Sequence, residues 1–180
     1  MKNHPVLAFV LGVWLGGSVL MTAVATYNFA GFADLFARNP ALAQHAGFDL
    51  KDADAKKASL LWVHSAELNR VLFHYWNRTQ IVLAALVLVL ALRARASWPV
   101  IALLGLSLGL VVYVHLVLEP QMEELGRQLD FVSRTPPPPG LATFQQLHQY
   151  SVIADGVRLA LLSAATLILF FTGPRAARSQ

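Results

Sequence analysis

Cysteine is absent from the 180 residues of this chain, and charged residues make up only 13% of them. Without a thiol the chain can form no disulfide, thiolate nucleophile, Cys-ligated zinc site or iron–sulfur cluster. A soluble domain of this length normally carries about twice this charged share. The formal net charge of +4 is modest and spread over chain ends and loops, which argues against a nucleic-acid-binding surface.

The apolar residues, 56% of the chain, are gathered in runs, which is typical of an integral membrane protein. We expect an all-α fold in which residues 1–180 form one integral membrane four-helix bundle. The predicted spans are about residues 6–29, 71–93, 99–119 and 151–172. The outer segments are 30–70 and 120–150, and the second to fourth helices are expected to extend beyond the outer membrane surface.

The first span also resembles a secretory signal peptide, with a basic start at Lys2 and small residues at Ala23-Val24-Ala25. A retained membrane anchor is favoured, because the apolar run reaches the roughly 20 residues that a bilayer requires. An aqueous loop is expected after it, with a short interfacial helix at 32–38 and a charged string at 49–57.

The second outer segment carries further local predictions. Pro120 is expected to bend the third helix, because proline removes a backbone donor. The continuation of that helix repeats apolar residues at steps of three and four, so we expect it to pack on the stretch 61–71. Thr143, with Gln146 three residues later, is the expected N-cap of the last helix.

Basic residues near the ends of the spans predict the orientation. Lys2, the turn with Arg93 and Arg95, and the tail with Arg175 and Arg178 fall on one side if the number of spans is even. The positive-inside rule makes that side cytoplasmic. We therefore expect a bacterial inner-membrane protein with both termini in the cytoplasm.

Small residues in two spans predict close helix packing. Gly12 and Gly16 form one GxxxG step, and Gly105 and Gly109 form another. Such steps let two helices approach closely in lipid. They are expected to close this bundle or, alternatively, to bind another membrane protein or a second copy of the chain.

Polar side chains of three predicted spans fall at a similar depth near the outer side. At about 1.5 Å rise per residue, Asn77, His115 and Asp155 come within several ångströms of one level. In the last helix Asp155 and Arg158 share one face and can pair. The expected polar cluster is His74, Asn77, His115, Glu119, His148, Ser151, Asp155 and Arg158.

This cluster has several possible roles. Its groups can satisfy one another and hold the helices in register, or they can form an outward pocket for a cation or polar solute. His74, His115, His148 and Glu119 offer the donor atoms of a zinc or copper(II) site, and two facing histidines could hold a b-type haem. A Ser–His–Asp hydrolase is disfavoured because the three residues share one helix. We therefore assign no catalytic residue and predict no cofactor.

Short motifs along the chain point to a known family. They are Trp14-Leu15-Gly16-Gly17, Arg70-x-x-Phe73-x-Tyr75-Trp76-Asn77-x-x-Gln80, Leu118-Glu119-Pro120 and Phe144-x-x-Leu147-His148-x-Tyr150-Ser151. In these motifs the chain resembles the transmembrane protein 205-like family over most of its length. The resemblance implies four membrane spans, a long outer segment before the second span and no established reaction. The association of the family's eukaryotic namesake with platinum-drug resistance implies solute or metal handling, although this chain has no cysteine to bind a soft metal.

These observations favour a non-enzymatic membrane protein whose outward polar cluster handles a solute or metal ion in connection with transport. One alternative is a structural or assembly subunit that binds another membrane protein through its glycine faces. The other is a membrane protein with a histidine-ligated metal or b-type haem. The expected partners are the lipid bilayer and a homo-oligomer or membrane protein, with no nucleic acid.

Overall fold

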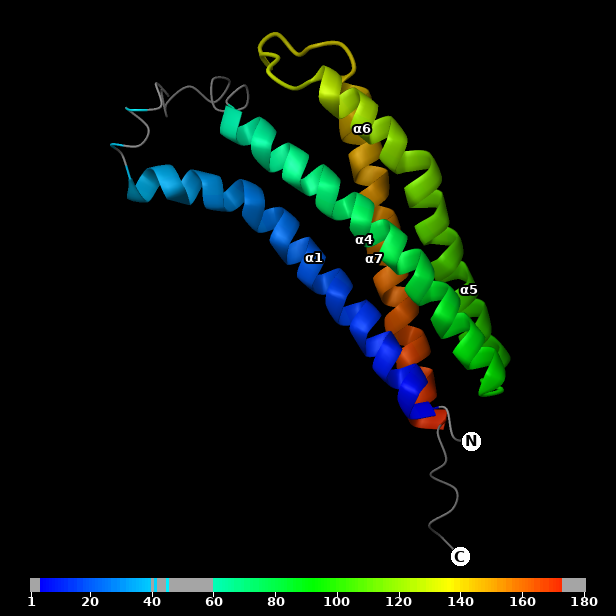
Figure 1. The fold of residues 1–180 in the computed structure, drawn as a ribbon. Coiled ribbons are helices and arrows are strands. Elements are labelled where there is room, and N and C mark those ends of the chain that lie inside the picture. The colour runs from blue at the N-terminus through cyan, green and yellow to red at the C-terminus, as the bar shows by residue number, and fades with distance from the viewer. Residues whose placement is uncertain (1–3, 40, 42–44, 46–59, 173–180) are drawn as a thin grey trace, which may run out of the picture.

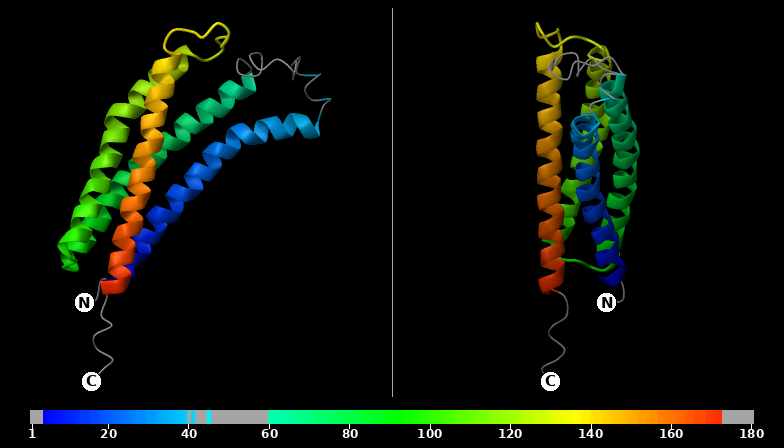
Figure 2. Two further views of the ribbon diagram at one scale, coloured as in Figure 1. Left: turned by 180° about the vertical axis from the view of Figure 1, so that it is seen from behind. Right: turned by 90° about the vertical axis from the view of Figure 1, so that its left-hand side faces the viewer.

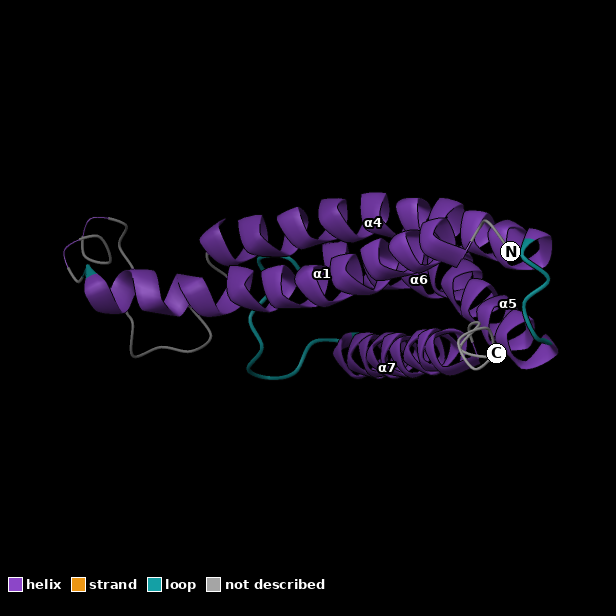
Figure 3. Cartoon of the chain, turned by 90° about the horizontal axis from the view of Figure 1, so that it is seen from below, coloured by secondary structure: helices purple, strands orange, loops and turns teal. Residues whose placement is uncertain are grey.

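Helices form all the regular secondary structure that the computed structural model describes, which covers residues 4–39, 41, 45 and 60–172 (Figure 3). In chain order they are α1 (His4–Arg38), α4 (Leu60–Arg93), α5 (Trp98–Tyr113), η1 (Val114–Leu118), α6 (Glu119–Gln128) and α7 (Leu141–Thr172). Helices α5, η1 and α6 follow one another without a break and form one long helix. Within it, η1 is a single π-helical turn.

Four stretches are long and apolar enough to cross a membrane, namely Pro5–Gly31, Trp62–Arg93, Trp98–Gln128 and Leu141–Phe171. The predicted all-α four-helix membrane bundle is thereby confirmed. Large apolar side chains such as Val82, Leu86 and Val89 are exposed on the outside of α4. Lipid tails cover such a surface in a bilayer, whereas a monomeric soluble protein rarely exposes one.

The helices form a ring in the order α1, α4, α5 and α7, which is closed because α7 also contacts α1. They converge where α4 turns into α5 and spread apart toward the connection between α6 and α7 (Figures 1 and 2). Toward that connection, α1 and α4 lean away from α6 and α7. The bundle therefore has a narrow end and a wide end.

The apolar core occupies the narrower part of the bundle. It is built from buried side chains of all four long helices: Leu7, Leu11, Trp14, Ala84, Val87, Ala91, Val100, Leu104, Val111, Leu162 and Ala165. A second, smaller cluster of Val114, Leu118 and Ala154 lies further along α5, η1 and α7. Burial of these side chains against one another leaves little room for polar groups on this side of the bundle.

At the wide end, α4, α6 and α7 continue beyond the spans expected from apolar residues alone. Helix α1 also continues without interruption to Arg38, so the separate interfacial helix predicted at 32–38 is part of the first long helix. The chain has no proline between Pro5 and Pro40 that would break it. The charged string at 49–57 lies outside the described residues.

The bend predicted at Pro120 takes the form of a π-helical turn just before it. The backbone N–H of Glu119 donates to the carbonyl of Val114, five residues earlier. Pro120 has no N–H, and its ring crowds the carbonyl four residues before it, so a regular α-helical pattern is disfavoured here. The wider turn accommodates the proline without ending the helix.

Helix α7 begins earlier than predicted. Its first residue is Leu141, and the N–H of Phe144 already donates to the carbonyl of Gly140 at 2.9 Å. Thr143 thus lies inside the first turn, and its prediction as the N-cap was wrong. Gly140 has a φ of +85°, a left-handed conformation that glycine adopts without steric cost, so the chain can turn into the helix there.

The glycine steps do not pack the helices of this bundle together, so that predicted role was wrong. A Cβ atom added to Gly12, Gly16, Gly105 or Gly109 would meet no atom of a neighbouring helix within 4 Å. The spacing of small residues predicts that two helices can approach closely but not which helix face meets a neighbour. The four glycines remain available to a partner outside the chain.

Gly17 is the glycine at which α1 and α4 come close together. A Cβ atom added to Gly17 would clash with the outer edge of the Trp76 ring. Trp76 is half-buried and packs against the apolar core. Its indole therefore fills the space that any larger residue at position 17 would need.

We expect Gly17→Ala to lower the free energy of unfolding by about 1–3 kcal/mol, because the added methyl group displaces the Trp76 ring. Gly16→Ala adds the same methyl group one residue away, where it faces open space. It should leave stability unchanged or raise it by up to about 1 kcal/mol. Thermal unfolding in detergent micelles measures both effects, and equal stability of the two variants would contradict the close contact.

Candidate functional site

Gln80 of α4 is the centre of a buried hydrogen-bond network. Its side-chain oxygen accepts from Nε1 of Trp14 on α1 at 3.1 Å and from the guanidinium of Arg158 on α7. Its side-chain nitrogen donates to Oδ1 of Asn77, one turn earlier on α4, at 3.2 Å. One amide group, 1% exposed, therefore joins three helices.

Glu119, the first residue of α6, extends this network to the fourth long helix. Its Oε2 accepts from Nδ2 of Asn77 at 3.0 Å. Nδ1 of His74 lies 2.9 Å from Oε1, and Nδ1 of His115 lies 2.6 Å from Oε2. Because a carboxylate only accepts hydrogen bonds, each of these ring nitrogens donates its N–H.

Asp155 and Arg158 form an ion pair along α7, with 3.2 Å between Oδ1 and a terminal guanidinium nitrogen. The side chain of Arg158 is almost fully buried, whereas that of Asp155 is 32% exposed. The other terminal nitrogen of Arg158 donates to Gln80, which is neutral. Asp155 is therefore the group that compensates the buried positive charge, and Glu119 does not take part in this pair.

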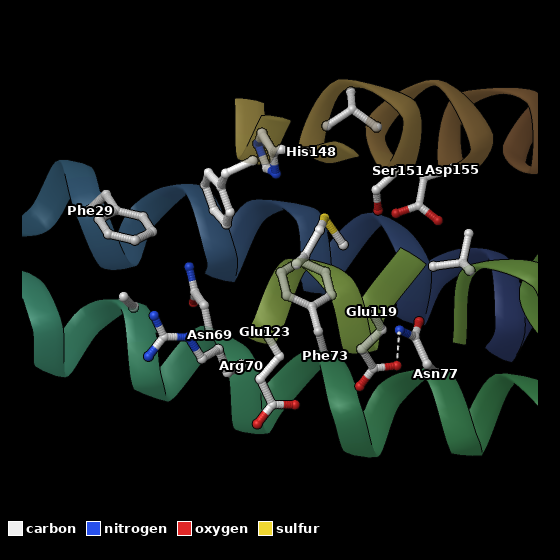
Figure 4. A pocket seen from close by; sticks show the side chains of 15 residues that line it. Phe29, Asn69, Arg70, Phe73, Asn77, Glu119, Glu123, His148, Ser151 and Asp155 are labelled. Carbon is white, nitrogen blue, oxygen red and sulfur yellow. Dashed lines mark hydrogen bonds between the residues drawn. The ribbon is translucent and has the colours of Figure 1, made fainter. Parts of the chain in front are cut away.

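A cavity of about 220 Å³ opens at the wide end of the bundle (Figure 4). Ser151 and Asp155 point into it from α7, on the side opposite Asn77 and Glu119 (Figure 4). Its wall is completed by Phe29, Ala66, Asn69, Arg70, Phe73, Val114, Met122, Glu123, Phe144, His148 and Val152. The lining thus combines aromatic and aliphatic walls with a few polar groups from facing helices, as ligand sites commonly do.

Carboxylates outnumber cationic side chains around this cavity. Glu119, Glu123 and Asp155 line it together with one guanidinium, that of Arg70, so three negative and one positive charge leave an excess of two negative charges. The ion-pair partners of Arg70, Glu123 and Asp155 add two carboxylates and two guanidinium groups, which cancel, and the partners of Glu119 are the imidazoles of His74 and His115, which add no charge in their neutral form. The negative excess therefore persists and favours a cation over an anion.

Arg70 ties α4 to the turn that follows α6. Its terminal nitrogens donate to both oxygens of Asp130, each at 2.8 Å, and one of them also donates to Glu67 at 2.9 Å. This planar, bidentate pairing fixes both distance and orientation. The continuation of the third helix was predicted to pack on the stretch 61–71. Leu68 and Val71 of that stretch do not make this apolar contact, because their side chains are exposed.

His148 does not join the other two histidines of the predicted cluster. Its exposed ring stacks on Phe144 along α7, with ring centroids 6.3 Å apart and an interplanar angle of 3°. Among the described residues no hydrogen bond joins His148 to Ser151 or Asp155. A nucleophile–base–carboxylate arrangement is therefore not formed on this helix.

His74 and His115 face each other across a carboxylate, with ring centroids 5.8 Å apart. Glu119 binds both rings and so occupies the position that a haem iron would need between two axial ligands. The arrangement therefore suits a small ion better than a b-type haem.

Gln80 is the central residue that the sequence analysis missed. A signal was available, because this amide borders the apolar stretch 81–92 and lies three residues after Asn77 on the same helix face. Trp14 offered no comparable signal, since tryptophan is common in membrane helices near an interface. Its partner lies 66 residues further along the chain, so only the packing of α1 on α4 brings the two together.

Comparison of the chain with family models, curated proteins and solved structures gives no match. The geometry and charge of the site are therefore the basis on which its function can be inferred.

We expect the double variant Asp155→Asn/Arg158→Met to be more stable than the sum of the two single losses predicts, by about 1–3 kcal/mol. Asp155→Asn alone leaves a buried guanidinium without its carboxylate, which is costly. Unfolding in detergent micelles of the wild type, both single variants and the double variant gives the coupling energy. Additive losses would show that the two charges do not depend on each other.

The exposed pair Asp34–Arg38 on α1 provides the matched control. It has the same kinds of charge at i,i+4 spacing, 3.5 Å apart, but its side chains are 64% and 80% exposed. The same double-variant analysis should give a coupling energy below about 0.5 kcal/mol there, because water screens exposed pairs.

Proposed function

We propose that this membrane protein binds a small organic cation in the cavity at its wide end and takes part in handling or transporting it. The observation that carries the proposal is the excess of two negative charges around an aromatic-walled cavity. A cation gains from both features, since carboxylates attract it and aromatic faces stabilise it through their quadrupoles.

The size of the cavity supports a small ligand. Its volume of about 220 Å³ equals that of roughly seven water molecules in the liquid, at about 30 Å³ each. Phe29, Phe73 and Phe144 line it, so an apolar body can be buried beside the charged group. A compact ammonium ion with one aromatic or short aliphatic substituent fits this description.

The protein is proposed to lie in a bacterial inner membrane with both termini in the cytoplasm, which places the cavity on the outer side. Supporting this orientation are Arg93, the last residue of α4, and Arg95 in the short turn to α5, both with exposed side chains at the narrow end. Lys2, Arg175 and Arg178 lie in the sequence next to the ends of α1 and α7 that share this end. The wide end holds mixed charges and does not oppose the assignment.

The resemblance to the transmembrane protein 205-like family supports the proposal of four membrane spans and of solute handling. It implies no particular reaction. Binding is proposed rather than catalysis. The support for this choice is that Asn77, Glu119 and Asp155 are engaged in ion pairs or hydrogen bonds and that the described residues around the cavity form no nucleophile–base pair.

A second candidate function is that of an assembly subunit. The observation that favours it is that a Cβ atom added to Gly12, Gly16, Gly105 or Gly109 would meet no atom within 4 Å. In lipid, faces with such small residues are sites where another helix can approach closely. The partner would be a second copy of this chain or another membrane protein.

The first proposal is tested with benzyltrimethylammonium, using benzylsulfonate as an anion of similar size. Calorimetric titration of the detergent-solubilised protein should show saturable binding of the cation and none of the anion. Glu123→Gln and Asp155→Asn should each weaken cation binding at least tenfold, which corresponds to about 1.4 kcal/mol. Each removes a negative charge from the cavity wall.

Asp34→Asn is the control for this experiment, because it removes one negative charge from an exposed site on α1 that does not line the cavity. Its affinity for benzyltrimethylammonium should equal that of the wild type. If both ions bind alike, or if Asp34→Asn weakens binding as much as Glu123→Gln, the cavity is not a cation site.

The second candidate is tested by Gly16→Ile and Gly109→Ile. Both should leave the thermal unfolding temperature nearly unchanged, because the added side chains face away from the bundle. If the faces bind a partner copy, the molecular mass in detergent, measured by light scattering, should fall to that of the monomer. An oligomer that keeps its size in both variants would contradict assembly through these glycines.

A further inference from the structure

His74, His115 and Glu119 converge on one point from two neighbouring helices. One ring nitrogen of each histidine and a carboxylate oxygen all lie within 4.8 Å of one another. The two nitrogen–oxygen contacts measure 2.9 and 2.6 Å. Two imidazoles and one carboxylate are also the protein ligands of a well-known class of zinc site, in which a fourth position is left open.

The spacing of these atoms is close to that around a tetrahedral ion. Metal–ligand bonds of about 2.0–2.2 Å place neighbouring ligand atoms roughly 3.3–3.6 Å apart at the tetrahedral angle. The two hydrogen-bonded separations, 2.9 Å from His74 to Oε1 and 2.6 Å from His115 to Oε2, are shorter than this range, and one donor atom of each residue lies within 4.8 Å of the others. A bound ion would take the place of the two hydrogen bonds, and each histidine would carry its proton on the other ring nitrogen so that the nitrogen facing Glu119 could bind the metal.

The backbone holds two of the three donors in place. His115 lies within η1, and Glu119 follows directly after this turn, four residues later. π-Helical turns are rare and occur frequently at functional sites. Pro120 disfavours a regular α-helix at this point, so the turn that spaces the two donors is built into the sequence.

Asn77 orients the third donor. Its Nδ2 donates to Oε2 of Glu119 at 3.0 Å, while its own Oδ1 accepts from Gln80 at 3.2 Å. Groups that fix metal ligands in this way influence metal affinity strongly. Because Gln80 is anchored to Trp14 and Arg158, the orientation of the carboxylate is coupled to the packing of the bundle.

The trio is accessible from one side. The side chain of His74 is 37% exposed, whereas those of His115 and Glu119 are 15% and 12% exposed. His74 also lines a second cavity of about 210 Å³, whose wall carries the carboxylates of Glu67 and Glu123 and the guanidinium groups of Arg70 and Arg127. The charges of this wall balance, so the cavity gives access to His74 without a net charge that would repel a cation.

We infer that His74, His115 and Glu119 bind one divalent transition-metal ion such as Zn²⁺. Imidazole and carboxylate donors suit Zn²⁺ and Cu²⁺, and three protein ligands leave a fourth position for water or a solute. The site goes beyond the proposed organic-cation cavity and does not depend on it, because that proposal is based on the net charge and aromatic walls of the cavity.

Co²⁺ is the probe, since its visible absorption reports tetrahedral coordination. The full-length protein in detergent micelles, with any affinity tag removed, is titrated with Co²⁺ and then with Zn²⁺. We expect one Co²⁺ per chain, intense visible bands and displacement by one equivalent of Zn²⁺. X-ray absorption at the zinc edge of the wild type should show two imidazoles and one carboxylate around the metal, a result that needs no variant.

Variants at the trio should separate this site from adventitious binding to histidines. His74→Ala and His115→Ala should each weaken Co²⁺ binding by more than about 100-fold, and Asn77→Ala by roughly 10- to 100-fold. His64→Ala and His148→Ala remove exposed histidines outside the trio and should bind Co²⁺ as the wild type does. Circular dichroism and thermal unfolding without metal establish that each variant is folded.

Unchanged Co²⁺ affinity in folded His74→Ala, or a zinc spectrum with oxygen ligands only, would overturn the inference. Benzyltrimethylammonium binding by the same samples keeps the two proposals apart. A His74→Ala protein that loses Co²⁺ but still binds the organic cation supports a separate metal site. A wild-type protein that binds the organic cation and no Co²⁺ overturns the metal site alone.

Discussion

The hydrogen bonds of the Gln80 side chain are the constraint on which the rest of the bundle depends. A buried amide without partners costs about 2–7 kcal/mol, and inside a bilayer there is no water to compensate it. Trp14, Asn77 and Arg158 all form hydrogen bonds with Gln80. These bonds fix the rotation of α1, α4 and α7 about their axes and their positions along the bundle relative to one another. Apolar contacts hold these helices together, but a slip of one turn would leave the same polar groups buried and unpaired.

This network also separates two regions of different character. Toward the narrow end, interdigitated apolar side chains fill the space between the helices. Toward the wide end, the helices diverge, Glu119 and Asp155 present carboxylates to a cavity, and the Arg70–Asp130 pair connects α4 to the turn after α6. The same polar residues can therefore specify helix packing and offer charge to a ligand, so a structural and a binding role for the cluster are compatible.

Predictions succeeded where the decisive interaction lies within one helix or between a helix and lipid. Four apolar runs were sufficient for the all-α membrane bundle, and the three-residue spacing of Asp155 and Arg158 anticipated their ion pair. Predictions failed where the neighbouring helix decides the outcome. Gly16 and Gly17 are adjacent in sequence, yet only Gly17 meets a ring of α4, because helix rotation directs one residue inward and the other outward.

By itself, the sequence determined the number of apolar helices, the position near Pro120 at which the third long helix is irregular, and the pairing of Asp155 with Arg158, since apolar length, local backbone chemistry and spacing within one helix are sufficient for these features. Only the tertiary structure decided that His74 and His115 meet at Glu119, that His148 lies apart and that Gln80 joins three helices. His74 and Glu119 are 45 residues apart, and their contact depends on the relative rotation and height of two helices. Those quantities are set by the packing of many side chains together and are encoded in no local pattern.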